Sequence, residues 1–280
     1  MAERFVLVLV LVIGGSPVNA NAETFGKNYY MTWGSDHVAF FDRNREAQLS
    51  MDLSSGAGFG SRFRYGSGFF GMKIKHPGRD SAGVVTAFYT ASDDGEMHDE
   101  MDFEFLGNRE GKPITLQTNV FVNGVGSREQ RIYLWFDPTA SFHLYRILWN
   151  PHQIVFYVDE IPIRVFKNKT VSNGAAYPVQ PMQVQASLWN GDSWATDGGQ
   201  TKTNWSYAPF EARFRGFGIN GCRTDNTSNC GSLDYWWNSP KHWQLDANEQ
   251  AQYEAVRKKY MMYDYCKDRT KYPTPPPECP

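Results

Sequence analysis

Short segments in which hydrophobic and polar residues alternate recur along much of this 280-residue chain, and that alternation constrains the fold more than any other feature. From about Phe25 to Phe217, short alternating segments are separated by Gly, Asn, Asp and Pro, and helical periodicity is almost absent. Because side chains two apart on a β-strand share a face, this alternation predicts strands with one buried face. We therefore predict an all-β sandwich, an architecture that often exceeds about 200 residues in one domain.

The clearest strand segments mix β-branched with aromatic residues. They are Gly68–Lys75, Gly83–Tyr89, Ile114–Val122, Phe142–Trp149 and Ile154–Val158. The Asn-Gly pairs that begin at Asn123 and Asn173 predict turns, because both residue types tolerate positive φ.

One helix is predicted, close to the C-terminus. Asp246 is its expected N-cap, and Glu249 three residues later completes a capping-box pattern. We expect the helix to run to about Tyr263 and to dock on the sandwich through a stripe that includes Tyr253 and Val256. The chain is thus expected to divide into a signal peptide at residues 1–22, a sandwich domain at residues 23–219 and a C-terminal extension at residues 220–280.

The N-terminus has the pattern of a secretory signal peptide. Arg4 precedes an apolar run, Phe5–Ile13, and small residues surround expected cleavage sites after Ala20 or Ala22. The run is too short to span a bilayer, and no later stretch approaches membrane length. We therefore expect a secreted protein with no membrane segment.

All four cysteines lie in the last quarter of the chain, and secretion favours disulfides. Four cysteines allow three pairings, but short loops close at least entropic cost, which favours Cys222 with Cys230 and Cys266 with Cys279. Zinc binding is the alternative. It lacks a Cys-x-x-Cys pair or histidines at ligand spacing. We expect no metal and no cofactor.

Net charge and composition limit the classes of molecule that the protein is expected to bind. The formal net charge of -2 gives no basic surface for a phosphate backbone, so nucleic-acid binding is disfavoured. Aromatic residues make up 15% of the chain, and many stand beside Gly, Asn and Asp, as expected where sugar rings stack on exposed faces. Burial in the core is the alternative for these aromatics. Glycan acceptor sequons begin at Asn168, Asn204 and Asn226.

The most informative segment runs from His98 to Gly107. Its strict alternation places Glu100, Asp102 and Glu104 on one strand face, opposite the apolar residues of the core face. Three carboxylates on one face repel one another, so the arrangement implies a function that uses them.

Glycoside hydrolysis is a reaction that needs two carboxyl groups on either side of the scissile bond. The Cα atoms of Glu100 and Glu104 are about 13 Å apart on an extended strand, and inward-leaning side chains can approach the roughly 5 Å spacing of a retaining pair. Asp102 between them can orient the nucleophile and separate the two pKa values. The alternatives are a solvated acidic face or a calcium site. Such a site would be built from Asp93, Asp94, Asp99 and Glu100.

At this point the sequence resembles a known family. The run from His98 to Leu106 is similar to the signature of glycoside hydrolase family 16, and specifically of the plant xyloglucan endotransglucosylase/hydrolases. The resemblance covers nearly the whole mature chain. Further similar segments are Leu116-Gln117-Thr118-Asn119, Arg128-Glu129-Gln130-Arg131, Leu134-Trp135-Phe136-Asp137-Pro138, Ile161-Pro162-Ile163-Arg164, Ser187-Leu188-Trp189-Asn190, Trp194-Ala195-Thr196 and Tyr263-Asp264-Tyr265-Cys266 with its later Pro-Pro-Glu-Cys.

The resemblance implies a concanavalin-like jelly roll of two curved antiparallel sheets that binds polysaccharide across its concave face. It implies Glu100 as nucleophile, Asp102 as helper, and Glu104 as general acid and then base. Further residues are implied to hydrogen-bond or stack with sugars. These are Gln117, Asn119, Arg131, Trp189 and Trp194.

By the same resemblance, the chain is expected to be a retaining endo-transglycosylase that cuts xyloglucan and joins it to another glucan chain in the cell wall. The expected partners are a polysaccharide donor and a glucan acceptor, xyloglucan or also cellulose, and the protein is expected to be a monomer in the apoplast. The alternatives are an endohydrolase of xyloglucan or another β-glucan, and an inactive carbohydrate-binding wall protein. One departure is visible: Asn108 lacks the hydroxyl residue of the sequon that family members often carry there.

Overall fold

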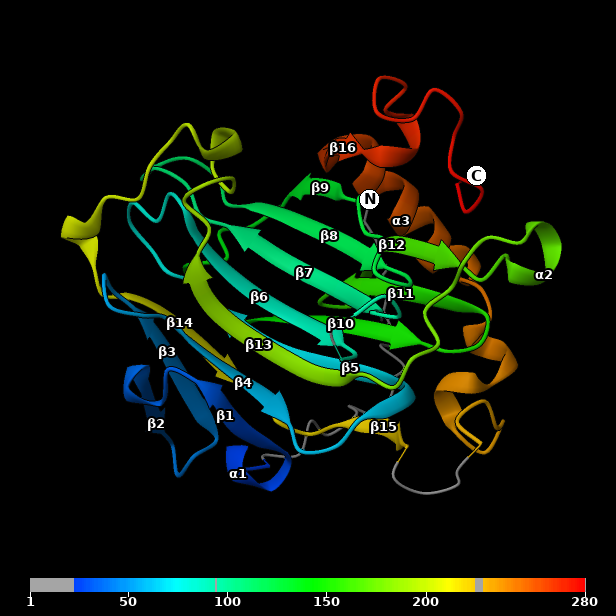
Figure 1. The fold of residues 1–280 in the computed structure, drawn as a ribbon, viewed down its shortest axis with the longest axis horizontal. Coiled ribbons are helices and arrows are strands. Elements are labelled where there is room, and N and C mark those ends of the chain that lie inside the picture. The colour runs from blue at the N-terminus through cyan, green and yellow to red at the C-terminus, as the bar shows by residue number, and fades with distance from the viewer. Residues whose placement is uncertain (1–22, 94, 225–228, 280) are drawn as a thin grey trace, which may run out of the picture.

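A computed structural model describes residues 23–93, 95–224 and 229–279. It shows two antiparallel sheets packed face to face, as Figure 1 displays, and confirms the predicted all-β sandwich. The expected signal peptide lies outside the described residues.

The first sheet contains eight strands, and the acidic segment predicted from the sequence lies near its middle as β7. Its spatial order is β1 (Tyr29–Trp33), β4 (Ala57–Ser61), β13 (Gln183–Asn190), β6 (Val84–Ala91), β7 (Glu100–Leu106), β8 (Thr115–Phe121), β9 (Gln130–Tyr133) and β16 (Met261–Asp264).

The second sheet lies behind the first in Figure 1. Its order is β12 (Ile161–Lys167), β11 (Gln153–Val158), β10 (His143–Trp149), β5 (Tyr65–Lys75), β14 (Phe210–Arg215), β3 (Glu46–Met51) and β2 (Val38–Phe41), with β15 (Asn220–Arg223) also paired to β5. The five predicted strand segments are thereby confirmed as β5, β6, β8, β10 and β11.

The core between the sheets explains how β7 is oriented. Phe103 and Phe105 are fully buried and pack edge-on against Phe156 and Tyr145 of the second sheet, with ring centroids 5.1 and 4.6 Å apart. Burying each such ring contributes about 1.5–3 kcal/mol. A slip of one residue would expose these rings, so the core holds the acidic positions on the opposite face.

Turn chemistry follows the sequence at the predicted positions. Asn123 and Gly124 adopt positive φ values of 50° and 75° and close a tight turn between Val122 and Val125. Gly174 adopts a φ of 74° at the end of the short helix α2 (Thr170–Asn173). The other short helix, α1, spans Phe25–Asn28.

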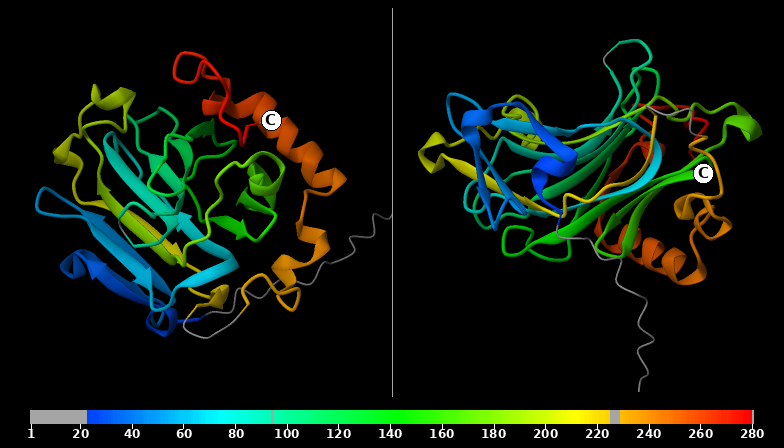
Figure 2. Two further views of the ribbon diagram at one scale, coloured as in Figure 1. Left: turned by 45° about the vertical axis from the view of Figure 1, so that its right-hand side comes forward. Right: turned by 90° about the horizontal axis from the view of Figure 1, so that it is seen from below.

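The C-terminal helix α3 (Ala247–Tyr260) begins as predicted but ends earlier. Asp246 accepts a hydrogen bond from Glu249 N, and Glu249 accepts one from Asp246 N, which completes the capping box. The prediction of a helix to about Tyr263 was wrong, because Met261–Asp264 leaves the helix and pairs with β9 as strand β16. Figure 2 shows α3 and the tail along one end of the sandwich.

Two disulfides secure this C-terminal region. Cys222 is bonded to Cys230 and Cys266 to Cys279, the pairing that short loops favour. Within the described residues, every helix is too short or too polar to cross a membrane.

Candidate active site

The strand pairing around β7 leaves space above its acidic face. Glu100 lies opposite Ala91 of β6, and Glu104 lies opposite Ala87. The small alanine side chains leave room beside each glutamate, and Tyr89 lies between them, opposite Asp102.

This acidic face lines an open groove of about 610 Å3. Glu100, Asp102 and Glu104 all line it, so the three carboxylates converge on one space. The groove runs from β7 across β6 to β13, and other lining side chains include Trp33, Tyr89, Gln185 and Trp189. An open groove of this kind admits an extended polymer from the side.

Glu100 is held by a histidine from the same strand face. His98 Nε2 lies 2.5 Å from Glu100 Oε2, and both side chains are mostly buried. This short contact fixes the position of the Glu100 carboxylate. Sequence reasoning assigned His98 no primary role, although its position two residues before Glu100 placed it on the same face.

Asp102 is buried between the two glutamates. Burial raises its pKa well above the usual range, and the nearby negative charge of Glu100 adds to the rise. A protonated Asp102 carboxyl donates a hydrogen bond to the Glu100 carboxylate. Asp102 is therefore held beside Glu100 with its carboxyl protonated.

Glu104 has the pKa of a group that carries a proton near neutrality. Burial raises its pKa to about 7, while the hydrogen bond from Gln117 Nε2, 2.6 Å long, opposes that rise. The two glutamates therefore differ in environment: Glu100 bonds to an imidazole, and Glu104 bonds to an amide in a drier position.

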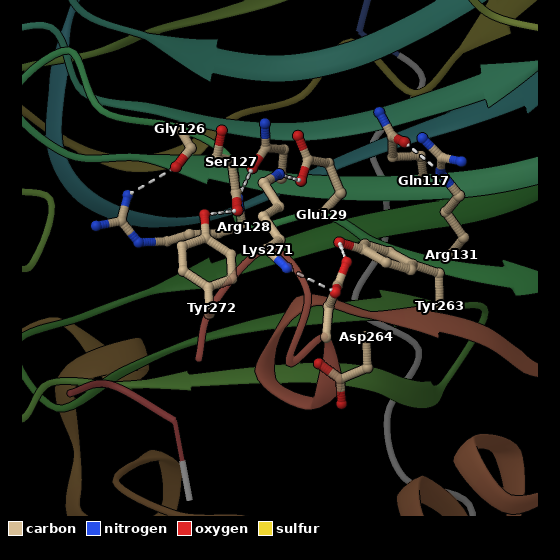
Figure 3. Close-up of polar contacts among 12 residues, drawn as sticks. Gln117, Gly126, Ser127, Arg128, Glu129, Arg131, Tyr263, Asp264, Lys271 and Tyr272 are labelled. Carbon is tan, nitrogen blue, oxygen red and sulfur yellow. Dashed lines mark hydrogen bonds and ion pairs between the residues drawn. The ribbon is translucent and has the colours of Figure 1, made fainter. Parts of the chain in front are cut away.

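A chain of polar contacts extends from Glu104 toward the C-terminal segment. Arg131 Nε donates to Gln117 Oε1 at 2.7 Å, and the Arg131 guanidinium lies over the ring of Tyr263 with 5.6 Å to its centroid (Figure 3). Gln117 is therefore oriented from both ends, with its amide nitrogen aimed at Glu104.

The C-terminal tail is tied to the loop before β9. Tyr272 Oη donates to Ser127 O at 2.7 Å, and Lys271 Nζ lies 3.0 Å from Glu129 Oε2 (Figure 3). The tail thus supports the end of the first sheet that carries Arg131 and Tyr263. No sequence pattern pointed to these contacts, because they join residues more than 140 positions apart.

Asn119 shares the face of Asp102 but is occupied by the backbone. Its Oδ1 accepts hydrogen bonds from Val120 N and Arg128 N, at 2.9 and 3.0 Å, and the residue is 5% exposed. The structure therefore places Asn119 as a loop support beside the site, with only its amide nitrogen left for other contacts.

The two predicted tryptophans lie together at the β13 side of the face. Their ring centroids are 6.0 Å apart, and both pack on the buried cluster of Val85, Leu106 and Ala195. Trp189 lines the groove. Trp194 supports it from the following loop.

Sequence reasoning missed further lining residues, among them Trp33, Tyr89 and Gln185. Tyr89 Oη donates to Gln185 Oε1 at 3.2 Å, which joins β6 to β13. Trp33 lies against Gly58, where a Cβ would come within 2.3 Å of the indole nitrogen. Alternation placed Tyr89 on the face of Ala87 and Ala91, whereas Trp33 is brought here only by the long-range pairing of β1 with β4.

The structure disfavours the alternative of a calcium site, because Asp99 is not free to bind an ion. Asp99 is fully buried, and its two oxygens accept backbone hydrogen bonds from Asn123, Val179 and Gln180. Asp99 therefore clamps two loops behind the acidic face. Asp94, another residue of that alternative, lies outside the described residues.

The loop after β7 is held by protein contacts. Asn108 Nδ2 donates to Pro113 O, and Arg109 Nη1 pairs with Asp80 at 2.8 Å. Of the predicted sequons, Asn168 and Asn204 each accept hydrogen bonds from the hydroxyl residue two positions later. Asn226 lies outside the described residues.

Comparison with known proteins identifies the family. Residues 25–207 match Glycosyl hydrolases family 16, and residues 231–279 match the Xyloglucan endo-transglycosylase (XET) C-terminus. This chain belongs to glycosyl hydrolase family 16. Among curated family members, Xyloglucan endotransglucosylase/hydrolase protein 2 of Arabidopsis thaliana is 59% identical over 98% of this chain and 94% of its own length. Protein 3 of the same series and plant is 60% identical over 91% and 88%.

Solved structures of other proteins share the fold. A Bacillus licheniformis β-glucanase aligns with a TM-score of 0.56 at 24% identity, covering 70% of this chain and 92% of its own. The Crh5 transglycosylase aligns with a TM-score of 0.53 at 22% identity, covering 67% and 78%. These structures share the sandwich of the main part of the chain, whereas residues 231–279 match the Xyloglucan endo-transglycosylase (XET) C-terminus.

Proposed function

We propose that this family 16 protein is a xyloglucan endotransglucosylase/hydrolase that cuts the β-1,4-glucan backbone with retention of configuration and transfers the glycosyl unit to another glucan chain. One observation carries the mechanism: three carboxyl groups converge on an open groove, and burial raises the pKa of both Asp102 and Glu104. The curated relatives carry both activities in their names.

In the first step, the Glu100 carboxylate attacks the anomeric carbon, and the bond from that carbon to the leaving glucan oxygen breaks. Glu104 donates its proton to that oxygen. His98 and protonated Asp102 hold Glu100 in place. The products of this step are a free glucan chain and a glycosyl ester on Glu100.

In the second step, an acceptor hydroxyl attacks the anomeric carbon of the glycosyl ester and gives its proton to Glu104, and the bond from that carbon to Glu100 breaks to release Glu100 as a carboxylate. A glucan acceptor yields a rejoined chain, and water yields a hydrolysed one. We propose Gln117, Arg131, Trp189 and Trp194 as contacts for the sugars on either side of the cut, with Asn119 contributing through its amide nitrogen.

The partners and location follow from the same proposal. Xyloglucan is the donor, and xyloglucan or cellulose is the acceptor. We propose a monomer that is exported by a signal peptide at residues 1–22 and works in the cell wall, with a catalytic domain at residues 23–219. The two disulfides fit an oxidising compartment.

The assay is incubation with xyloglucan and a labelled xyloglucan oligosaccharide, across several donor polymers. We expect label in high-mass polymer. Shortened products without incorporated label would instead establish an endohydrolase.

The variant Glu100→Ala separates an enzyme from an inactive binding protein. We expect turnover to fall by at least about 10^4-fold, as when a catalytic nucleophile is removed, with polymer affinity retained. Unchanged product formation would exclude Glu100 as the nucleophile.

A further inference from the structure

Two tryptophans are exposed on the side of the molecule that faces away from the groove. Trp236 is 41% exposed and Trp243 is 38% exposed. They belong to the segment between β15 and α3, which is orange in Figures 1 and 2. Two short 3-10 helices shape this segment, Trp236–Asn238 and Pro240–His242.

The packing of this segment fixes which face it covers. Trp237 is buried in a cluster with Leu148, Val155 and Tyr157 of the second sheet. These positions alternate with Ile147, Ile154 and Phe156, which belong to the core between the sheets. The segment therefore lies on the outer face of the second sheet, whereas the catalytic carboxylates lie on the outer face of the first.

The backbone under the two exposed rings is rigidly held. Asn150 Nδ2 donates to Trp237 O and to His242 O, at 2.9 and 3.0 Å, and Gln153 Nε2 also donates to His242 O at 3.0 Å. Trp243 Nε1 donates to Asn238 O at 2.9 Å. The rings are thus presented in fixed positions before any partner arrives, which limits the entropy lost on binding.

Histidine rings extend the aromatic surface. His152 is stacked with Trp243 at 4.1 Å between centroids and 24° between planes. Trp236 contacts His242 edge-on at 5.3 Å. These two ring pairs lie close together because His242 and Trp243 are neighbours in the chain, and we name the four rings the aromatic strip.

The size of the aromatic strip argues against a protein partner. At these exposed fractions, each tryptophan offers about 100 Å2 or less. A stable protein interface, including one with a second copy of this chain, buries about 1,200 Å2 or more in total. A few fixed aromatic faces are instead what a sugar polymer needs, because the axial C–H groups of β-linked pyranose rings stack on the electron-rich faces of indoles.

We infer that the aromatic strip of Trp236, His242, Trp243 and His152 is a second, non-catalytic binding site for an unbranched β-linked glucan chain. The inference rests on the proposed function only for the class of polymer. A strip on an outward-facing surface contacts a chain presented at the surface of an insoluble glucan, while the groove on the opposite side remains free. The strip would thus hold the enzyme on its polymer between catalytic events.

The test measures binding without turnover. The variant Glu100→Ala is mixed with particles of insoluble β-1,4-glucan in the presence of saturating xyloglucan oligosaccharide, which fills the groove. We expect binding to persist, and to change little between low and high salt because the polymer is uncharged. Elimination of binding by the oligosaccharide would assign all affinity to the groove and overturn the inference.

Paired substitutions then test the rings. In the same background, the double variant Trp236→Leu/Trp243→Leu should bind at least about tenfold more weakly, because leucine has no flat face. The double variant Trp236→Phe/Trp243→Phe keeps flat rings and should stay within about threefold of the parent. Leu233→Ala, an exposed substitution in the same segment, is the control and should bind like the parent. Equal binding by the leucine and phenylalanine pairs would refute the strip.

Two further measurements keep the result interpretable. With Glu100 present, the leucine pair should act on soluble short donors at the parental rate, so a loss there would indicate misfolding or a role in the groove. If the leucine pair does not fold, hydrogen exchange of the Glu100→Ala protein on the particles should show protection at residues 236–243. Absence of that protection, or a dimer in sedimentation that the phenylalanine pair dissolves, would contradict the inference.

Discussion

At the scale of single residues, the site depends on the different surroundings of two glutamates, Glu100 and Glu104, on one strand. Burial of Glu104 raises its pKa, the hydrogen bond from Gln117 opposes part of that rise, and the result is a pKa of about 7. A general acid must be protonated at the start of the first step. A carboxyl group with this pKa is protonated at mildly acidic pH and still partly protonated at neutral pH.

The pH dependence of catalysis follows from that value. We expect kcat/KM to fall as the pH rises through about 7, where Glu104 loses its proton. Gln117→Leu removes the hydrogen bond that lowers this pKa, so the basic limb of the profile should move to higher pH. Gln185→Leu is the control on the same face, with an unchanged limb expected. If the basic limb of the Gln117→Leu variant lies at the same pH as in the parent, Gln117 does not lower the pKa of Glu104.

The same pKa makes a prediction about stability. The folded-state pKa of Glu104 is raised from 4.5 to about 7, so the folded protein binds this proton more tightly than the unfolded chain does. The contribution of Glu104 to the free energy of unfolding should therefore be greatest below about pH 4.5. That contribution should be lost as the pH rises to about 7. Glu104→Gln should flatten that slope in denaturant titrations. An unaltered slope would contradict the raised pKa.

Single residues also mark where sequence reasoning reached its limit. Alternation sufficed to put Glu100, Asp102 and Glu104 on one face, because the core side of the strand is Met101, Phe103 and Phe105. The pairing of Arg131 with Gln117 depends on strand register, which no local pattern specifies. The contribution of Tyr263 depends on a strand that the sequence did not predict.

At the scale of elements, strands with clean alternation were predictable and short or terminal ones were not. β7 and β8 carry alternating apolar residues that only a sheet can bury on one side. β16 has four residues and follows α3 directly, and its aromatic residue continues the helical stripe. Tertiary pairing with β9 decides its conformation, which is why the predicted end of the helix was three residues late.

The start of α3 offers a test at this scale. Asp246→Ala removes the side-chain acceptor of the capping box and should lower the free energy of unfolding by about 1 kcal/mol. For a chain of this size, that loss should reduce Tm by about 2–4 °C in calorimetry. Glu254→Ala, an exposed change within the same helix, should shift the stability by less than about 0.5 kcal/mol. Equal effects of the two substitutions on stability would show that the capping box does not stabilise the protein.

At the scale of the whole molecule, the fold separates two tasks onto two outer faces. The first sheet presents the groove, and the C-terminal segments complete both sheets, β15 beside β5 and β16 beside β9. The tail then returns to the loop before β9 through Tyr272 and Lys271. The C-terminal region is therefore part of the structure that supports the site, and its sequence pattern alone suggested only an appended helix.

The most direct measurement of the central claim is the identity of the residue that carries the glycosyl unit. Glu104→Ala should accept an activated xyloglucan oligosaccharide fluoride, whose leaving group needs no acid, and should then deglycosylate slowly because the base is missing. Peptide mapping by mass spectrometry after rapid acid quenching should find the added oligosaccharide as an ester on Glu100. An adduct on Asp102, or turnover of the fluoride with inverted configuration and no adduct, would contradict the account.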